Sequence, residues 1–285
     1  MTGNPRAIRR QLGNTTVTAL CDGYLDLPFG ALLGIEEADA AALLRQAFRR
    51  PAPRSNINAF LVQSPGRTVL IDTGGGSSMG PTAGRLPDAL AEAGVAPNDI
   101  GAVLLTHLHT DHWGGLATPD GQAAFPNAEL VLAAAEAAYW LDSARVAEAP
   151  DDAAKARFAG TQAAVALYRD RMRSFTGTDV LPGIQAMPLP GHTPGHTGYL
   201  VEGDVPLLIW GDVLHVQDVQ ALRPEVGMRF DSDPEAAIAS RRRVLDMAAA
   251  DRLLVAGMHL HFPAFSHVAR AAEGYALAPE VWAAD

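Results

Sequence analysis

Apolar and polar residues alternate with two different periods along this chain, and the two periods predict a mixture of strands and helices. Period-two patterns and short apolar runs indicate strands. They cover residues 15–22, 58–63, 68–71, 102–105, 129–133, 184–189, 198–202, 206–210 and 252–256. Helical spacing predicts helices over residues 36–50, 85–93 and 234–249, and residues 134–175 are expected to be mostly helical.

Turn and capping residues support these boundaries. Pro51 stops the first helix, Gly94 ends the second, and Ser232-Asp233-Pro234-Glu235 is a start signal for the third. Asp22-Gly23 marks a turn, and Ser64-Pro65-Gly66-Arg67 separates two runs that predict a hairpin-like pair.

The order of these elements predicts the fold class. Strand pairs followed by helices recur in both halves, which indicates two similar α/β layers around one core, with helices outside and sheets inside. No low-complexity linker or charge block marks a boundary, so we expect a single domain over residues 1–285 with a helical insert at about 134–175. Trp140 and Phe158 in the insert form either an apolar wall or lid over a site, or ordinary packing.

Composition narrows the classes of partner. The formal net charge is −10 and the pI about 5.3, whereas nucleic-acid and anionic-membrane surfaces need clustered Lys and Arg. No run approaches the roughly 18 apolar residues of a membrane helix, and Met1 to Gly13 lacks the apolar stretch of a signal peptide. Cys21 is the only cysteine, so no disulfide forms within the chain. We therefore expect a soluble cytoplasmic protein.

Residues 107–112, His-Leu-His-Thr-Asp-His, carry the strongest chemical signal in the sequence. They follow the apolar run at 102–105 directly, which places them at the carboxyl edge of a sheet, where α/β proteins build their sites. Neutral imidazole nitrogen is a good ligand for borderline metals such as zinc. The hexapeptide therefore predicts a metal site.

The other histidines and one aspartate extend this prediction to two metal ions. All nine histidines lie between residues 107 and 267, and the motifs Gly191-His192-Thr193-Pro194-Gly195-His196, Trp210-Gly211-Asp212 and Gly257-Met258-His259 follow strand-like runs or turns. His107, His109 and His192 are expected to hold one ion. Asp111, His112 and His259 are expected to hold a second, and the two oxygens of Asp212 suit a bridge.

Several of these assignments have competitors. His261 and His267 compete with His259 as the last ligand. His196 is expected to support the site from a turn, and His215 either touches substrate or packs elsewhere. Asp72, which precedes three glycines, is expected to orient a ligand.

At these motifs the chain resembles the metallo-β-lactamase superfamily. The matching pieces are Ile71-Asp72-Thr73-Gly74, residues 107–112, residues 191–196, Gly211-Asp212 and His259, in family order. The resemblance implies an α/β fold of the αββα sandwich type, with two mixed β-sheets flanked by helices, and a dinuclear metallohydrolase site.

Within the superfamily the chain is similar to the branch that contains methyl parathion hydrolase and related lactonases. The cues are Gly80-Pro81-Thr82, Gly84-Arg85-Leu86, Phe230-Asp231-Ser232-Asp233 and His259-Leu260-His261-Phe262-Pro263. The last cue favours His259 over His261. The resemblance implies the same seven ligands. In the expected mechanism the catalytic residues are Asp212, which bridges the ions, and Asp111, which steers the attacking hydroxide or passes a proton to the leaving oxygen.

The expected activity is hydrolysis of a lactone or carboxylic ester by a metal-bridging hydroxide. Two divalent ions are expected, with zinc preferred and manganese, cobalt or iron as alternatives. Organophosphate triesterase and glyoxalase II-like thioesterase activities are the alternatives within the fold, and an iron redox protein is the alternative from another class. A small-molecule ester or lactone is the expected partner, and family analogy allows a homodimer.

Overall fold

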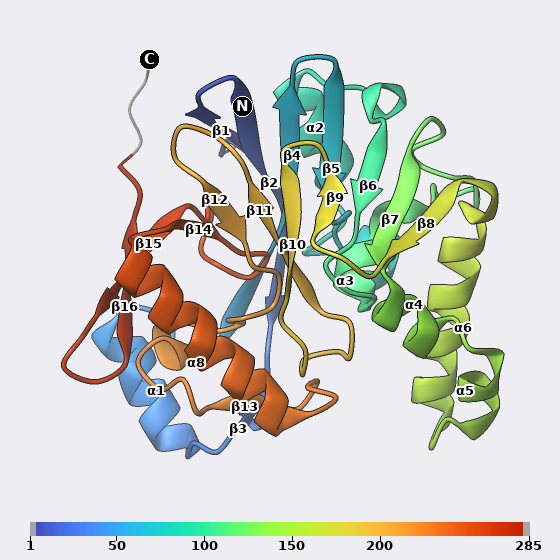
Figure 1. Cartoon of the computed structure of the whole chain (residues 1–285). Helices are drawn as coiled ribbons and strands as arrows, with labels where there is room; N and C mark the ends of the chain where they lie inside the picture. The colour runs from blue at the N-terminus through green and yellow to red at the C-terminus, as the bar shows by residue number, and fades with distance from the viewer. Residues whose placement is uncertain (1–3, 282–285) are drawn as a thin grey trace.

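The computed structural model describes residues 4–281 of the 285-residue chain, and it contains two seven-stranded mixed sheets with helices outside them. Figure 1 shows the two sheets packed against each other in the middle of the molecule, with α-helices on both sides. The αββα sandwich expected from the motifs is therefore confirmed. The first three and last four residues included in the single-domain expectation lie outside the described part.

The first sheet comes from the N-terminal half and has the order β1-β2-β4-β5-β6-β7-β8. Its strands are β1 (Ala7–Leu12), β2 (Thr15–Asp26), β4 (Arg54–Ser64), β5 (Arg67–Ile71), β6 (Ala102–Leu104), β7 (Glu129–Ala133) and β8 (Met172–Phe175). Strands β4 and β5 form the expected antiparallel hairpin, which closes at the Ser64–Arg67 pair. From β5 to β8 all neighbours are parallel, so the carboxyl ends of β5, β6 and β7 meet at one edge.

The second sheet comes from the C-terminal half and has the order β16-β15-β14-β12-β11-β10-β9. Its strands are β9 (Asp179–Leu181), β10 (Ile184–Pro188), β11 (Thr197–Val201), β12 (Leu207–Ile209), β14 (Leu254–Ala256), β15 (Ser266–Arg270) and β16 (Tyr275–Pro279). Only β12 and β14 pair in parallel. A separate small sheet joins β3 (Leu32–Leu33) to β13 (Gly227–Met228).

The helices lie outside the sheets and between strands. They are α1 (Glu37–Gln46), α2 (Leu86–Ala93), α3 (Thr110–Trp113), α4 (Ala134–Trp140), α5 (Ser143–Glu148), α6 (Asp152–Ala166), α7 (Gln217–Gln220) and α8 (Pro234–Asp251). Short 3-10 turns cover Phe29–Ala31, Gly76–Met79, Pro97–Asp99, Gly114–Leu116 and Arg169–Arg171. Figure 1 shows α4, α5 and α6 together beyond β7 and β8, with α1 and α8 on the opposite side. No helix in the described residues is both long enough and apolar enough to cross a membrane.

Alternation along the strands of the first sheet builds two separate cores. Phe60, Ile71 and Leu104 face the second sheet and pack in one cluster with Tyr199 and Ile209. Their neighbours Leu61, Leu70 and Val103 point the opposite way and pack against the apolar side of α2. Because successive strand residues alternate between faces, each strand contributes to both layers.

The structure differs from the sequence expectation at the end of the helical insert and at both edges. Residues 172–175 were expected to be mostly helical, but they form β8, which pairs in parallel with β7. Strands β1, β15 and β16 and the short strands β3, β9 and β13 were not predicted. The helix expected over residues 36–50 ends at Gln46, because Phe48 adopts a left-handed conformation with φ of 58°.

Candidate metal centre

The hexapeptide lies where β6 ends. His107 and His109 occupy the extended segment after the strand, and Asp111 and His112 lie on the short helix α3 that follows it. Asp72 comes directly after the neighbouring parallel strand β5 and accepts hydrogen bonds from the backbone N–H of Thr106, at 2.8 Å, and from its hydroxyl, at 2.7 Å. These bonds join the ends of β5 and β6 beneath the histidines.

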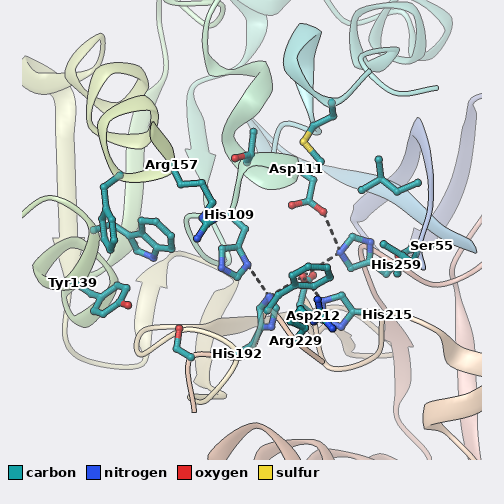
Figure 2. A pocket seen from close by; sticks show the side chains of 18 residues that line it. Ser55, His109, Asp111, Tyr139, Arg157, His192, Asp212, His215, Arg229 and His259 are labelled. Atoms are coloured by element: carbon teal, nitrogen blue, oxygen red, sulfur yellow. Dashed lines mark hydrogen bonds and ion pairs between the residues drawn. The ribbon is translucent and has the colours of Figure 1, made fainter. Parts of the chain in front are cut away.

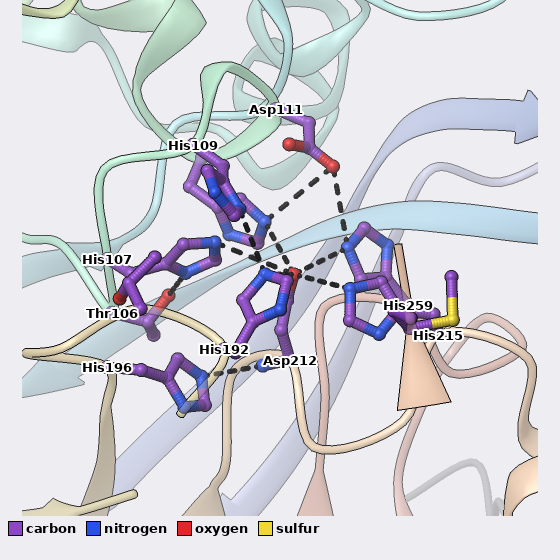
Figure 3. A network of polar contacts seen from close by, with 12 residues as sticks. Thr106, His107, His109, Asp111, His192, His196, Asp212, His215 and His259 are labelled. Atoms are coloured by element: carbon purple, nitrogen blue, oxygen red, sulfur yellow. Dashed lines mark hydrogen bonds and ion pairs between the residues drawn. The ribbon is translucent and has the colours of Figure 1, made fainter. Parts of the chain in front are cut away.

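The second sheet supplies the remaining residues from its own strand ends and loops. His192 lies on the loop between β10 and β11, Asp212 follows β12, and His259 follows β14. Figure 3 shows these three side chains in one cluster with His107 and His109, and Asp111 at the side of the cluster near His259. The structure thus brings together all seven residues that the sequence selected, although they come from four separate motifs.

The centre of this group is one oxygen of Asp212. Its Oδ2 lies 3.1 Å from Nε2 of His215 and of His259, 3.2 Å from Nε2 of His112 and of His192, and 3.6 Å from Nε2 of His107. A carboxylate oxygen has too few lone pairs to accept hydrogen bonds from five nitrogens. Such a gathering of imidazole nitrogens around one carboxylate oxygen is typical of a metal site, where cations lie between these atoms.

Two overlapping groups of possible ligand atoms fit two ions. His107, His109 and His192 form one group, and Asp111, His112 and His259 form the other, with the atoms of each group within 4.8 Å of one another. Asp212 forms further groups with His107 and His112, and with His192 and His215. These buried histidine and aspartate clusters are consistent with a dinuclear metal site.

Buried polar atoms that lack a hydrogen-bond partner give an independent test of whether these residues suit a metal centre. Nε2 of His107, Nε2 of His112 and Oδ1 of Asp212 are buried and have no hydrogen-bond partner among the described residues. Buried polar atoms without a partner are costly, and bound cations would satisfy all three. The residues present therefore fit a metal centre.

Hydrogen bonds on the outer side of the imidazoles fix their orientation. Nδ1 of His112 lies 2.7 Å from Oδ2 of Asp72, and Nδ1 of His192 lies 2.8 Å from Oδ1 of Asp231. Nδ1 of His259 lies 2.6 Å from the backbone carbonyl oxygen of Asn56. Each contact favours the tautomer that has its proton on Nδ1, which leaves Nε2 free to bind a metal.

The pKa directions follow from burial and from the neighbouring charges. Burial lowers the pKa of His107 and of His109 well below the usual range, and nearby imidazoles add to the effect, so both rings are neutral. Burial also opposes the cationic form of His192, but hydrogen bonds to Asp212 and Asp231 raise its pKa to about 9. Burial disfavours ionised Asp212, yet the surrounding imidazoles hold its pKa well below normal.

Glu136 supports the site in a way that the sequence did not reveal. Its carboxylate is 1% exposed and accepts hydrogen bonds from the backbone N–H of Leu108, at 2.8 Å, and of Gly195, at 2.9 Å. It also accepts one from the hydroxyl of Thr193 at 2.7 Å. One buried side chain therefore connects the two histidine motifs. Nothing local marks Glu136, because it lies in an alanine-rich helix.

The other histidines separate into two kinds. His196 lies under the centre, where its Nδ1 contacts the carbonyl oxygen of Leu189 and its Nε2 accepts the backbone N–H of Asp212 at 2.9 Å. His215 is buried beside Asp212 and lines the cavity, a position that sequence reasoning left undecided. His261 and His267 contact Asp218 and Glu280 instead, so neither competitor of His259 joins the cluster.

A cavity of about 560 Å³ opens above this centre, and Figure 2 shows its lining. One side is aromatic, with Tyr139, Trp140 and Phe158 from α4 and α6. The ring centroids of Trp140 and Phe158 lie 4.7 Å apart, and Trp140 also contacts the His109 ring edge to face. Both residues therefore form a wall of the cavity and pack within the insert. Leu25, Leu27, Met79 and Phe230 provide further apolar surface.

The sequence profile of the metallo-β-lactamase superfamily matches residues 52–259, which is well over half of the chain. The chain therefore belongs to this superfamily, as its motifs predicted. The hydrolase AbOPH, a member of the same superfamily, has a crystal structure that matches with a TM-score of 0.93 and 30% identity, covering 99% of this chain and 100% of that one.

Two lactonases are similar as well. An N-acyl homoserine lactonase from Bacillus sp is 27% identical over 175 residues, and the match spans 60% of this chain and 60% of the length of that relative. AidC, a dizinc quorum-quenching lactonase, has a structure with a TM-score of 0.90, 24% identity and 98% coverage of both chains. The likeness to AidC shows a shared fold.

Proposed function

We propose that this protein is a dinuclear metal-dependent hydrolase that opens a lactone or cleaves a similar carboxylic ester. The observation that carries the proposal is the convergence of five imidazole nitrogens on one oxygen of Asp212, within 3.1 to 3.6 Å, at the floor of a partly apolar cavity. The similarity to an N-acyl homoserine lactonase supports the choice of a carboxylic ester.

The proposed ligand assignment follows the two groups of ligand atoms. His107, His109 and His192 would hold one ion, Asp111, His112 and His259 would hold the other, and Asp212 would serve both. Zinc is the first choice, because the set contains five imidazoles and two carboxylates. Two such ions polarise a carbonyl oxygen and supply hydroxide at neutral pH.

Protein side chains around the centre orient the ester and handle a proton. Asp111 is partly open to the cavity, with 16% of its side chain exposed, and its Oδ2 lies 3.4 Å from Nε2 of His259. It is the carboxylate best placed to pass a proton to the departing alkoxide. The aromatic wall of Tyr139, Trp140 and Phe158 receives the apolar part of the substrate and excludes water.

The direct test is a substrate panel with and without chelator. The purified, zinc-loaded protein is assayed with six kinds of substrate. These are homoserine lactones, aromatic lactones, aryl esters, a phosphotriester, a glutathione thioester and a β-lactam. We expect the highest kcat/KM on a lactone or carboxylic ester, loss of that activity with chelator, and recovery with zinc. Activity that survives chelation, or a preference for the phosphotriester or thioester, contradicts the proposal. Iron with visible absorbance in the native protein favours a redox role instead.

Metal counting tests the ligand assignment separately. We expect fewer tightly bound ions in His109→Ala and Asp212→Ala than in the wild type, measured by elemental analysis after dialysis. His267→Ala is the matched control, because His267 is half exposed and lies on β15 against Glu280. Two tightly bound ions in His109→Ala or Asp212→Ala would show that the assignment is wrong.

A further inference from the structure

The charged residues that line the cavity are unusual for so acidic a chain. Apart from Asp111 and Asp212, which belong to the metal centre, they are Arg157 and Arg229. In the chain as a whole, 32 Asp and Glu residues outnumber 22 Lys and Arg residues, which gives a net charge of −10. The lining thus contains two guanidinium groups in addition to the two carboxylates of the metal centre.

Both arginines are exposed, and neither has a carboxylate partner in the described part of the chain. Among residues 4–281 the side chains of Arg157 and Arg229 form no ion pair within 4.0 Å and donate no hydrogen bond. Arg54, by contrast, donates to Asp26 at 2.7 Å, and Arg173 to Glu129 at 3.1 Å. The donors of the two cavity arginines are therefore available to a ligand.

The two arginines reach the cavity from different parts of the fold. Arg157 precedes Phe158 on α6, and Arg229 directly follows β13. Figure 2 shows Arg157 on the side of Tyr139 and Arg229 on the side of His192 and Asp212. The backbone N–H of Arg229 donates to the carbonyl of Ala31 at 2.9 Å, which anchors the segment that carries this guanidinium.

We propose that the natural substrate carries a carboxylate at a position separate from the ester bond that is cleaved, and that Arg157 and Arg229 recognise it at the cavity entrance. This inference rests on the proposed ester hydrolysis and narrows its substrate class to anionic esters or lactones. The apolar part of such a molecule packs on the aromatic wall while its carboxylate faces the arginines. Guanidinium binds carboxylate through two parallel hydrogen bonds, which gives geometric selectivity as well as attraction.

The test compares a matched pair of substrates. The monoaryl ester of glutaric acid carries a free carboxylate, and the corresponding aryl valerate has almost the same length without one. We expect the wild type to prefer the glutarate ester in kcat/KM, and Arg157→Gln or Arg229→Gln to reduce that preference about tenfold, chiefly through KM. Added salt should reduce the preference in the wild type, because the entrance is exposed to solvent.

Arg145→Gln is the matched control. Arg145 is an exposed arginine on α5 that lies 4.5 Å above the Tyr139 ring, yet it does not line the cavity. We expect this variant to keep the wild-type preference. Equal hydrolysis of both esters by the wild type, or an equal loss of preference in Arg145→Gln, overturns the inference.

A binding measurement decides the inference independently of turnover. The binding of glutarate and of neutral glutaramide to the zinc-loaded protein is measured by calorimetry. We expect the wild type to bind glutarate more tightly than glutaramide. Glutarate binding should weaken in Arg157→Gln and Arg229→Gln but not in Arg145→Gln. Indistinguishable binding in all variants contradicts the arginine site. If hydrolysis continues in the presence of chelator, or if neither ester is hydrolysed, the proposed function is contradicted instead. Failure of the arginine site and failure of the proposed function are therefore distinguishable.

Discussion

Nδ1 of His112 lies 2.7 Å from Oδ2 of Asp72, and neither side chain is exposed to solvent. The contact forms because β5 and β6 are parallel neighbours, so the residues that follow them meet at one edge of the sheet. Asp72 accepts at the same time from Thr106, which fixes both of its oxygens. As a result Nε2 of His112 points to Asp212 and not to the protein interior.

Asp72→Asn is expected to reverse the tautomer of His112. The asparagine oxygen would accept from the Thr106 N–H, and its NH2 group would then face Nδ1 of His112 and leave the ring proton on Nε2. We expect zinc affinity at the second position to fall about 10- to 100-fold, measured by competition with a chromophoric chelator. Asp170→Asn, an exposed position, is the control. An unchanged affinity in Asp72→Asn would show that this contact does not orient a ligand.

Glu136→Gln is expected to weaken the connection between the two histidine motifs. The amide has only one acceptor oxygen, so it cannot accept from both Leu108 and Gly195 as the carboxylate does. We expect the free energy of unfolding to fall by about 1–3 kcal/mol, measured by urea denaturation of the metal-free protein. Glu148→Gln, on the exposed side of α5, should leave it unchanged. Equal stabilities of the two variants would count against this role.

Phe158→Ala is expected to enlarge the apolar side of the cavity. The side chain is 9% exposed and packs on Trp140. We expect KM for long-chain or aromatic esters to rise more than KM for acetyl esters, together with a stability loss of about 3–5 kcal/mol. Val165→Ala removes buried volume from the same helix without touching the cavity, so it should not change the ratio of the two KM values. Equal changes of this ratio in both variants would contradict the proposed wall.

Arg241→Met is expected to loosen the loops behind Asp212. The buried guanidinium donates to the carbonyl of Val213 at 2.7 Å and to those of Pro224 and Val226 at 3.0 and 2.9 Å. Burial lowers the pKa of Arg241 to about 10, so it remains charged at neutral pH. Methionine leaves three carbonyls without this donor, and we expect a loss of about 3 kcal/mol in the free energy of unfolding. Arg242→Met, at the next and exposed position, should have little effect.

Periodicity and motifs predicted the αββα architecture, and the same motifs led to the family. The core strands were predictable because their apolar runs are continuous, and α8 because Pro234 and the cap residue Asp233 mark its start. The proposed ligands could be selected in advance because several histidines placed directly after apolar strands are typical of a metal site. The structure then brings these residues together, but which of them hold metal is still a proposal.

The features that were missed depend on contacts between residues far apart in the sequence. The strands at or next to the sheet edges, β1, β8, β15 and β16, are short or carry charged residues, so their own sequence gives little sign of the partner strand that orders them. Glu136 acts on residues about sixty positions away, and Asp231 reaches His192 across 39 positions. Arg157 and Arg229 resemble any solvated arginine until the cavity is known.

The distribution of the proposed ligands over the two sheets has a consequence for folding. His107 follows β6 of the first sheet, whereas His259 follows β14 of the second sheet and is oriented by Asn56, from β4 of the first sheet. The complete set of proposed ligands therefore exists only when strands from both halves of the chain have folded against each other. Under the proposed assignment, metal uptake is coupled to the docking of the two sheets, because neither sheet alone carries all seven side chains.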